Sequence, residues 1–308
     1  MTLETFTQPL QTAVLFLVFN RLSTTKQVFE AIREAKPPRL YIAADGAREA
    51  KDHEDKKVQE VRNFIISNID WDCEVKTLFR KNNLGCKMAV SGAIDWFFNQ
   101  EEMGIILEDD CLPSQSFFWF CEELLLKYKD NMRVGQISGD NFQKGMVRGD
   151  ADYYFSIYNH IWGWASWANR WSKYDVDLKT IDNASFLKNI FNENSTIRYW
   201  SNIFDTMKQK QIDTWDYQWT FTMWHHKFLT VLPNKNLVAN IGFGEDATHT
   251  MVENEFSNLT AGDIYLSKHP QNIVENKEAD LFTTKLMFSK PSIIVRVIRK
   301  IKRFLNEM

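Results

Sequence analysis

The stretch GIILEDDCLPSQSFFWF, residues 104–120, sets a short apolar run directly before three carboxylates, Glu108, Asp109 and Asp110. A continuous apolar run is typical of a buried parallel strand, and charged residues mark the sheet edge where such a strand ends. No lysine or arginine neighbours the three carboxylates in the sequence, so a divalent cation is the simplest compensator of their repulsion. Oxygen ligands suit Mg²⁺ or Mn²⁺, which usually bind phosphate oxygens as well.

The residues before this stretch alternate between strand-like and helix-like patterns. Apolar runs predict strands at residues 13–19, 39–46, 74–79 and 104–107. Helical spacing of apolar residues predicts helices around residues 28–35, 58–69, 86–98 and 117–128, the last one preceded by Pro113 and a serine suited to capping it. This alternation predicts an α/β fold, with an open and mostly parallel sheet that helices cover on both faces.

From about residue 150 the sequence becomes aromatic-rich and irregular, and residues 158–171 and 213–226 hold most of the tryptophans. No linker separates the two halves, so we expect one domain over residues 1–250, with halves at about 12–150 and 151–250, followed by an extension over 251–308. A domain boundary near residue 150 stays open as the alternative.

Composition narrows the class of protein. A net charge of −3 over 308 residues gives no global footprint for nucleic acid, and 44% hydrophobic residues support a large core. The four cysteines lack CxxC spacing, and the apolar stretch near the N-terminus lacks the flanks of a signal peptide. No apolar run reaches the roughly 18 residues that a membrane span needs. We therefore expect reduced thiols and a cytoplasmic location.

The C-terminal segment, residues 290–308, combines an apolar helical stripe with six basic residues. This combination suits a helix on an anionic membrane surface, here the inner face of the cell membrane. A terminal helix docked on the protein's own core is the alternative, and the sequence leaves both open.

Polar residues follow each predicted strand of the first half. They are Asn20 and Arg21, then Asp45 and Gly46, then Arg80, Asn82 and Asn83, then the three carboxylates. Each group alone is ordinary loop chemistry, but ligands of open α/β sheets bind at the carboxyl ends of the strands. Together the groups predict a polar site in which a metal neutralises a departing nucleoside diphosphate.

These residues resemble a known family. The segment ILEDDCLPSQSFFWF looks like the metal-site segment of GT-A glycosyltransferases, and in particular like that of N-acetylglucosaminyltransferase I. The similarity extends to VFNRLSTTKQVFEAI, AADG, NNLGCKMAVSGAIDWFF, HIWGWASW and WDYQW, over residues 12–250. The chain also resembles bacterial nucleotide-diphospho-sugar transferases of surface-polysaccharide gene clusters.

The resemblance implies roles for single residues. Arg21 and Asp45 would hold the nucleotide, which the resemblance makes uridine-based. Glu108 and Asp109 would support the ribose and base or the waters of the metal, and Asp110 would ligate the metal directly. The first half of the domain would thus bind the nucleotide, and the second half would bind the acceptor.

Three further positions complete the predicted site. Arg80 and Asn82 enter the site by strand position only. His249 would be a late metal ligand or phosphate contact, and a surface-loop histidine is the alternative.

The general base is where this chain departs from the pattern, because residues 155–164 contain no carboxylate. Asp216 resembles the base of many inverting GT-A enzymes, and its aromatic neighbours favour a raised pKa by desolvation. Asp213 and Asp140 are rival bases, and Asp216 as a helix cap is the structural alternative. His160 is either a base or a contact to a sugar hydroxyl.

Most of the tryptophans are expected in the core, because large aromatic side chains dominate burial. One or two of them suit a platform for an acceptor sugar, and Trp164 and Trp215 are the candidates.

The expected function is a metal-dependent, inverting glycosyltransferase (class EC 2.4) that acts in polysaccharide biosynthesis on a glycan or lipid-linked acceptor. A sugar-phosphate nucleotidyltransferase is the rival enzyme, but it would carry a glycine-rich loop where residues 19–25 have no glycine. A non-catalytic carbohydrate-binding protein is the third possibility, and it leaves the acidic triplet unexplained.

Overall fold

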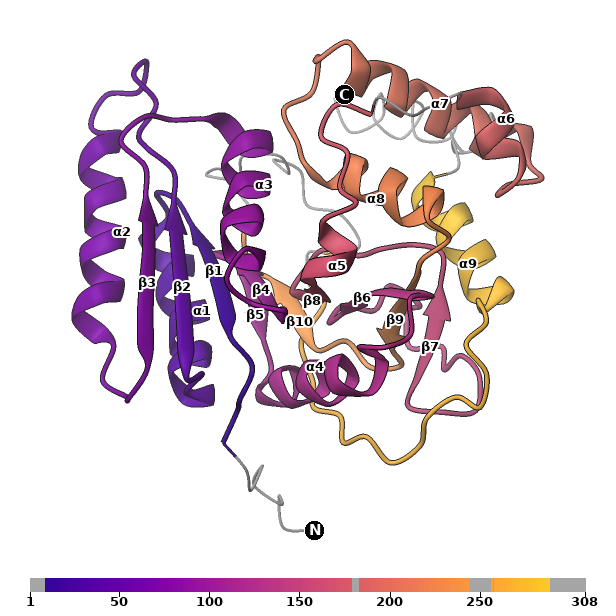
Figure 1. Cartoon of the computed structure of the whole chain (residues 1–308), viewed down its shortest axis with the longest axis horizontal. Helices are drawn as coiled ribbons and strands as arrows, with labels where there is room; N and C mark the ends of the chain where they lie inside the picture. The colour runs from indigo at the N-terminus through magenta and orange to yellow at the C-terminus, as the bar shows by residue number, and fades with distance from the viewer. Residues whose placement is uncertain (1–8, 179–182, 244–255, 257, 289–308) are drawn as a thin grey trace, which may run out of the picture.

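Strand β1 (Val14–Val18) forms the centre of the first half of an eight-stranded sheet in the computed structural model (Figure 1). The structure describes residues 9–178, 183–243, 256 and 258–288. Strands β2 (Arg39–Ala44), β3 (Glu74–Phe79) and β4 (Met103–Glu108) run parallel to β1 in the order β3-β2-β1-β4. All five residues of β1 are buried, as expected for a strand covered on both faces.

Alternate residues of β1 face two different layers of helices. Val14, Phe16 and Val18 share a core with helices α1 (Leu22–Ala35), α2 (Glu54–Asn68) and α4 (Gln115–Tyr128). Leu15 and Leu17 face helix α3 (Gly85–Phe98) on the opposite side. The predicted α/β sheet with helices on both faces is therefore confirmed.

The sheet continues beyond β4 with β8 (Trp164–Trp167), β6 (Val134–Ser138), β9 (Leu229–Pro233) and β7 (Tyr153–Ser156), in that order. Strands β6 and β9 run in the same direction as β1 to β4, whereas β8 and β7 run in the opposite direction. The sheet is therefore mostly parallel and mixed in its second half.

Short elements complete the fold. Strand β5 (Cys111–Pro113) pairs with β10 (Val238–Asn240) directly after the acidic triplet. Pro113 thus ends a strand, and Ser114 stands at the start of α4 with its hydroxyl on Ser116 Oγ, not on a helix amide. The remaining helices are α5 (Ala168–Trp171), α6 (Asn183–Lys188), α7 (Asn194–Lys208), α8 (Asp216–His225) and α9 (Lys277–Thr283), followed by a π-helical turn, Thr284–Phe288.

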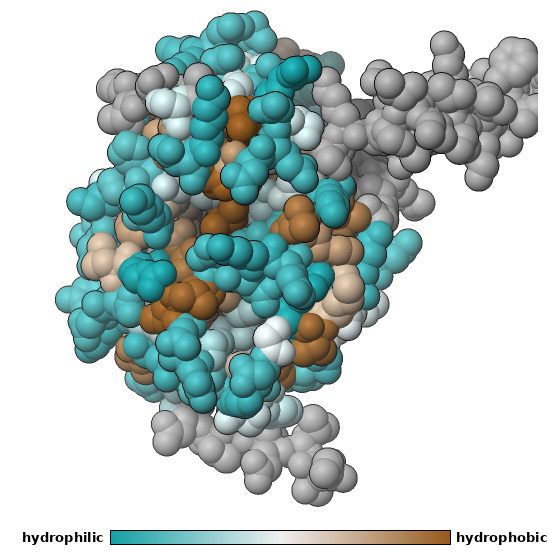
Figure 2. Space-filling view, turned by 90° about the vertical axis from the view of Figure 1, so that its right-hand side faces the viewer, coloured by the Kyte–Doolittle hydropathy of each residue, from teal (hydrophilic) through white to brown (hydrophobic). Residues whose placement is uncertain are grey.

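Helix α9 closes the far edge of the sheet against β7. Asp280 accepts hydrogen bonds from Ser156 Oγ and from the backbone N–H of Ile157, the latter at 3.3 Å. Burial raises the pKa of the Asp280 carboxyl to about 7. The face seen from the right of Figure 1 shows apolar side chains as separate patches among hydrophilic ones (Figure 2).

The cysteines, the length of the helices and the basic C-terminal segment bear on where in the cell the protein is expected. All four cysteines are free thiols, as expected. Within the described ranges, no helix combines the length and apolar character that crossing a membrane requires. The basic segment 290–308 lies outside the described residues, so the choice between membrane and core stays a prediction.

Candidate functional site

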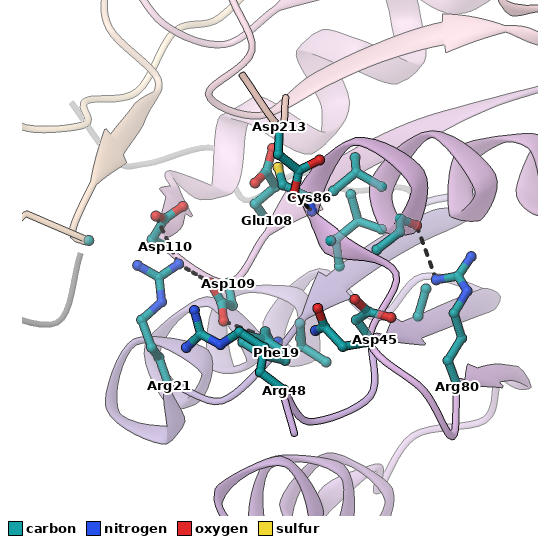
Figure 3. Close-up of a pocket in the computed structure, with 18 of the residues that line it drawn as sticks. Phe19, Arg21, Asp45, Arg48, Arg80, Cys86, Glu108, Asp109, Asp110 and Asp213 are labelled. Carbon is teal, nitrogen blue, oxygen red and sulfur yellow. Dashed lines mark hydrogen bonds and ion pairs between the residues drawn. The ribbon is translucent and has the colours of Figure 1, made fainter. Parts of the chain in front are cut away.

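A pocket of about 290 Å³ opens at the carboxyl ends of β1, β2 and β4, beside the start of α3 (Figure 3). Its polar lining comes from segments far apart in the sequence. The charged and amide side chains that line it are Arg21, Asp45, Arg48, Arg80, Asn83, Glu108, Asp109, Asp110, Asp213 and Asn240. Six of the residues that the sequence assigned to the nucleotide or the metal therefore share one cavity, together with Asn83 and the rival base Asp213.

Arg21 neutralises part of the acidic triplet. Its guanidinium forms ion pairs with Asp109 and with Asp110, the latter at 3.0 Å (Figure 3). Burial disfavours the charged guanidinium, but the two carboxylates outweigh this and raise the pKa of Arg21. The absence of a neighbouring cation in the sequence was therefore misleading, because the turn between β1 and α1 supplies one.

Negative charge nevertheless remains in excess. Burial, together with the charges of Asp110 and Asp109, raises the pKa of the Glu108 carboxyl well above its ordinary value. Burial also raises the pKa of Asp109, although the Arg21 charge opposes that shift. Five carboxylates and three guanidiniums line the pocket within the described chain. Arg48 is additionally paired with Glu54. An anionic ligand would therefore need a further cation here.

Asp45 fixes the loop that leads into α3. Its carboxylate accepts the backbone N–H of Leu84 at 2.9 Å, and burial raises its pKa. Gly46 is required beside it, because a Cβ there would lie 2.4 Å from the backbone carbon of Asn82. Asp45 thus faces the pocket from a closely packed turn.

The residues after β3 are placed differently from the prediction. Among the described residues, Asn83 lines the pocket and Asn82 does not, because the Asn82 backbone packs against Gly46. The amide of Asn83 donates to the Gly46 carbonyl at 2.8 Å. Arg80 lines the pocket, but its guanidinium donates to the carbonyl of Ala89 at 3.1 Å (Figure 3).

Arg48, Phe19 and Asn240 line the pocket, although no role was predicted for them from the sequence. The Arg48 guanidinium lies 5.4 Å from the centroid of the Phe19 ring, and Glu54 holds it there. Glu54 also accepts from Asn20 Nδ2 at 2.9 Å, which ties the β1–α1 turn to the β2–α2 loop. Arg48 stands three residues after Asp45, so the loop position was the signal that was available.

Asp213 joins the second half of the chain to the pocket. Its carboxylate accepts the backbone N–H groups of Cys86 at 2.8 Å and Lys87 at 3.0 Å, and thereby caps α3. Gly85, with φ of +78°, allows this close approach, because a Cβ there would lie 2.5 Å from Asp213 Oδ2. Both oxygens of this rival base therefore accept hydrogen bonds from the backbone.

Asp216 begins α8 and accepts a hydrogen bond from Thr214 Oγ1. It stands outside the lining of the pocket as the described residues define it. Burial is the main cause of the raised pKa of Glu108 and of the Cys86 thiol, and the charge of Asp216 adds to both, so Asp216 lies near these two pocket residues. The role of base stays a prediction.

The tryptophan platform is wrong as predicted. Trp164 is 1% exposed and Trp215 is 2% exposed, and their rings stack on each other at 5.6 Å inside the core under α3. Trp164 lies in β8, in the middle of the sheet, so neither ring is accessible to a sugar.

His160 and its rival Asp140 lie outside the pocket lining found among the described residues, and they are bonded to each other. His160 Nδ1 and Asp140 Oδ1 are 2.8 Å apart in a buried pair. His249 belongs to residues that the structure does not describe, so its role as a metal ligand stays a prediction.

The donor atoms fit a divalent ion that shares its coordination with a substrate. Within the described ranges, no three histidine, cysteine or acidic side chains converge to hold a metal by themselves. Asp110 lines a pocket with surplus negative charge, and Mg²⁺ or Mn²⁺ is commonly bound by one or two carboxylates, waters and phosphate oxygens. The residues present fit such an ion and not a closed protein cage.

Comparison with known proteins gave only distant similarities. No family model matches the chain, and no curated protein matches its sequence. Among solved structures, the chain is similar to GalNAc-T7 with UDP, GalNAc and Mn²⁺, at 13% identity and a TM-score of 0.41, over 74% of this chain and 43% of that one.

Two other solved structures are similar to the chain at comparably low identity and TM-score. The galactosyltransferase LgtC in complex with donor and acceptor sugar analogues has 11% identity and a TM-score of 0.35, over 69% of this chain and 70% of that one. The 4-diphosphocytidyl-2C-methyl-D-erythritol synthase from Anaerococcus prevotii has 9% identity and a TM-score of 0.34, over 59% and 85%. At TM-scores below 0.5 these similarities carry no argument about activity, so the case for function rests on the pocket.

Proposed function

We propose that this protein is a metal-dependent glycosyltransferase that moves a sugar from a nucleotide-diphospho-sugar to a hydroxyl group of an acceptor. The observation that carries the proposal is the pocket at the carboxyl edge of the parallel strands. It gathers Arg21, Asp45 and the acidic triplet, which are the residues that the GT-A resemblance assigns to the nucleotide and the metal. Ligands of open α/β sheets bind at this edge.

Positive and negative side chains of the pocket suit different parts of the proposed donor. Arg21 and Arg48 offer guanidiniums to phosphate oxygens, and Asp45 offers a carboxylate to hydrogen-bond donors of the nucleotide. The Phe19 ring beside Arg48 offers an apolar face to a base. Uridine is the proposed base, on the sequence resemblance.

Asp110 is the proposed metal ligand, with Glu108 and Asp109 supporting the metal's waters or the ribose. A bound Mn²⁺ or Mg²⁺ would stabilise negative charge on the leaving diphosphate. The surplus of carboxylates in the pocket supports this assignment, because a diphosphate alone would add to the repulsion.

Asp216 is the proposed base for an inverting transfer. Its carboxylate would take the proton of the acceptor hydroxyl as that oxygen attacks C1 and the nucleoside diphosphate leaves. After burial and the charges of Asp110 and Asp109, the charge of Asp216 also contributes to the raised pKa of Glu108, which supports a position near the acidic triplet.

The acceptor is proposed to be a glycan or a lipid-linked sugar of polysaccharide biosynthesis. The basic, apolar-striped segment 290–308 supports a peripheral position on an anionic membrane. Deleting residues 290–308 should shift the protein from vesicles of anionic lipid to the supernatant in a sedimentation assay. Equal sedimentation of both forms would contradict the membrane proposal.

The test of the function is a screen of UDP-sugars for UDP release with Mn²⁺ present. We expect the wild type to release UDP from at least one of them, and Asp110→Asn to lose about 10²-fold or more of that rate. Asp72→Asn, a matched change at an exposed position, should behave like the wild type. Equal rates in Asp110→Asn and the wild type would contradict the assignment.

A further inference from the structure

A second polar cluster lies at the same edge of the sheet, beyond the acidic triplet. Trp164 of β8 pairs with Ile106 of β4 on one side and with Ser138 of β6 on the other. Two residues after these partners come Glu108 and Asp140. The two carboxylates therefore stand at the same level, separated by one intervening strand, or about 10 Å.

The strand directions confirm that the second cluster faces the same way. Strands β4 and β6 are both antiparallel to β8, so their carboxyl ends share one edge. His160 precedes β8 in the sequence and so lies at this edge as well. Burial raises the pKa of the Cys111 thiol, the charges of Asp110, Glu108 and Asp140 add to this shift, and the thiol donates to Asp110 Oδ1 at 3.4 Å. The cluster thus adjoins the proposed donor site.

Asp140 and His160 are held in one arrangement. Asp140 Oδ1 lies 2.8 Å from His160 Nδ1, and Asp140 Oδ2 accepts the backbone N–H of Trp162 at 3.3 Å. Gln136 and Ser138 both donate to the carbonyl of His160, which fixes the backbone there. The ring is therefore oriented by its backbone and by its partner carboxylate.

The other ring nitrogen of His160, Nε2, is buried without a hydrogen-bond partner in the described part of the chain. His160 is 5% exposed and Asp140 is fully buried. In the neutral imidazole, an Nδ1–H donated to Asp140 leaves Nε2 with a lone pair. Leaving a buried polar atom unpaired is costly, so such an atom points to a ligand that donates to it.

A chain of aromatic rings leads away from the His160 ring. The Phe142 ring lies 4.6 Å from the His160 ring, and the Trp162 ring meets Phe142 edge-on at 5.0 Å. Phe243 contacts Trp162 at 5.9 Å. Trp162 and Phe243 are partly exposed, in contrast to Trp164 two residues further on. Partly exposed aromatic faces beside a hydrogen-bond acceptor suit a sugar ring, which has apolar C–H faces and hydroxyl edges.

We propose that Asp140, His160 and Trp162 form the acceptor subsite, in which a hydroxyl group of the acceptor sugar donates to His160 Nε2 and the C–H face of the sugar lies on Trp162. To call this an acceptor subsite rests on the proposed function. Asp140 acts as a positioning residue, because it selects the tautomer that leaves Nε2 as a hydrogen-bond acceptor. The proposal places the donor's sugar between Glu108 and Asp140, which stand about 10 Å apart with one strand between them.

The test uses methyl glycosides of glucose, galactose and N-acetylglucosamine as probes, with binding followed by saturation-transfer NMR in the presence of UDP and Mn²⁺. The wild type should bind at least one of them. His160→Phe keeps an aromatic ring against Phe142 but removes the acceptor nitrogen, and Trp162→Ala removes the platform. Each change should weaken glycoside binding by about tenfold or more, whereas His225→Phe, at an exposed position of α8, should not change it.

Kinetics separate this proposal from its rivals. With a UDP-sugar that the wild type consumes, His160→Phe should raise the KM for the glycoside by about tenfold or more and change kcat much less. Unchanged glycoside binding in both variants would overturn the proposal, as would a wild type that binds none of the probes. A collapse of kcat at unchanged KM would also overturn it, because His160 would then be the base. Failure of the proposed function is distinguished from failure of this proposal by a separate result, because the wild type would then not bind UDP.

Discussion

The two ends of the sheet's carboxyl edge are built in different ways. At the donor end, charged residues follow their own strands directly, and Arg21 meets the acidic triplet across neighbouring parallel strands. At the proposed acceptor end, Asp140 and His160 come from β6 and from the entry to β8, which are antiparallel. The residues of the donor end therefore reach the sheet edge because each directly follows its own strand. The residues of the acceptor end meet because the register of β6 against β8 brings them together.

The largest effect should distinguish Trp164 from Trp162. Trp164→Ala removes a ring that is 1% exposed and stacked on Trp215, so it should lower the free energy of unfolding by about 3–5 kcal/mol. Trp162→Ala removes a partly exposed ring and should cost less stability, while weakening acceptor binding. Urea unfolding measures the stability of both variants. Equal destabilisation by the two changes would contradict the contrast between a core ring and a platform.

Asp216→Asn tests the boundary between the two ends. It should leave UDP binding unchanged and lower sugar transfer by about 10²-fold, because an amide cannot take the acceptor's proton. Steady-state rates and a calorimetric titration with UDP give the two quantities. Near-normal transfer would remove Asp216 as the base and would favour Asp213, Asp140 or His160.

Asp280→Asn tests the far edge beside the acceptor end. The folded-state pKa of Asp280, about 7, exceeds its ordinary value of 3.8. Between these values the folded state keeps a proton that the unfolded state has lost, so this carboxyl makes stability fall as pH rises from about 4 to 7. The asparagine should remove this fall and stabilise the protein by about 2 kcal/mol at pH 8, with little gain at pH 4. Thermal unfolding at both pH values checks this, and an equal effect at both would contradict it.

The smallest effect is expected for the bridge between the two halves. Asp213→Ala removes the cap of α3, so it should lower the free energy of unfolding by about 1 kcal/mol and weaken donor binding several-fold. A change in acceptor binding with unchanged donor binding would show that the loop serves the other end instead.

The sequence predicted the donor end because a residue that directly follows a buried strand must emerge at the sheet edge. Arg21, Asp45 and the triplet needed no knowledge of pairing beyond the alternation of strands and helices. The same argument misplaced Asn82, since the close approach of the backbone to Gly46 turns the next residue, Asn83, into the pocket.

The acceptor end was predicted less well for a physical reason. Trp162 and Trp164 stand in one motif, and composition does not tell which ring the sheet buries. Register decides this, because Trp164 is held between Ile106 and Ser138 whereas Trp162 lies before the strand. The bond between Asp140 and His160 is likewise a product of tertiary structure.

The central claim is that the pocket binds a nucleoside diphosphate together with a divalent cation. A calorimetric titration of the wild type with UDP, first with Mn²⁺ and then with excess EDTA, tests it most directly. We predict binding with Mn²⁺ that weakens by at least tenfold with EDTA. Equal affinity under both conditions, or no binding under either, would contradict the account.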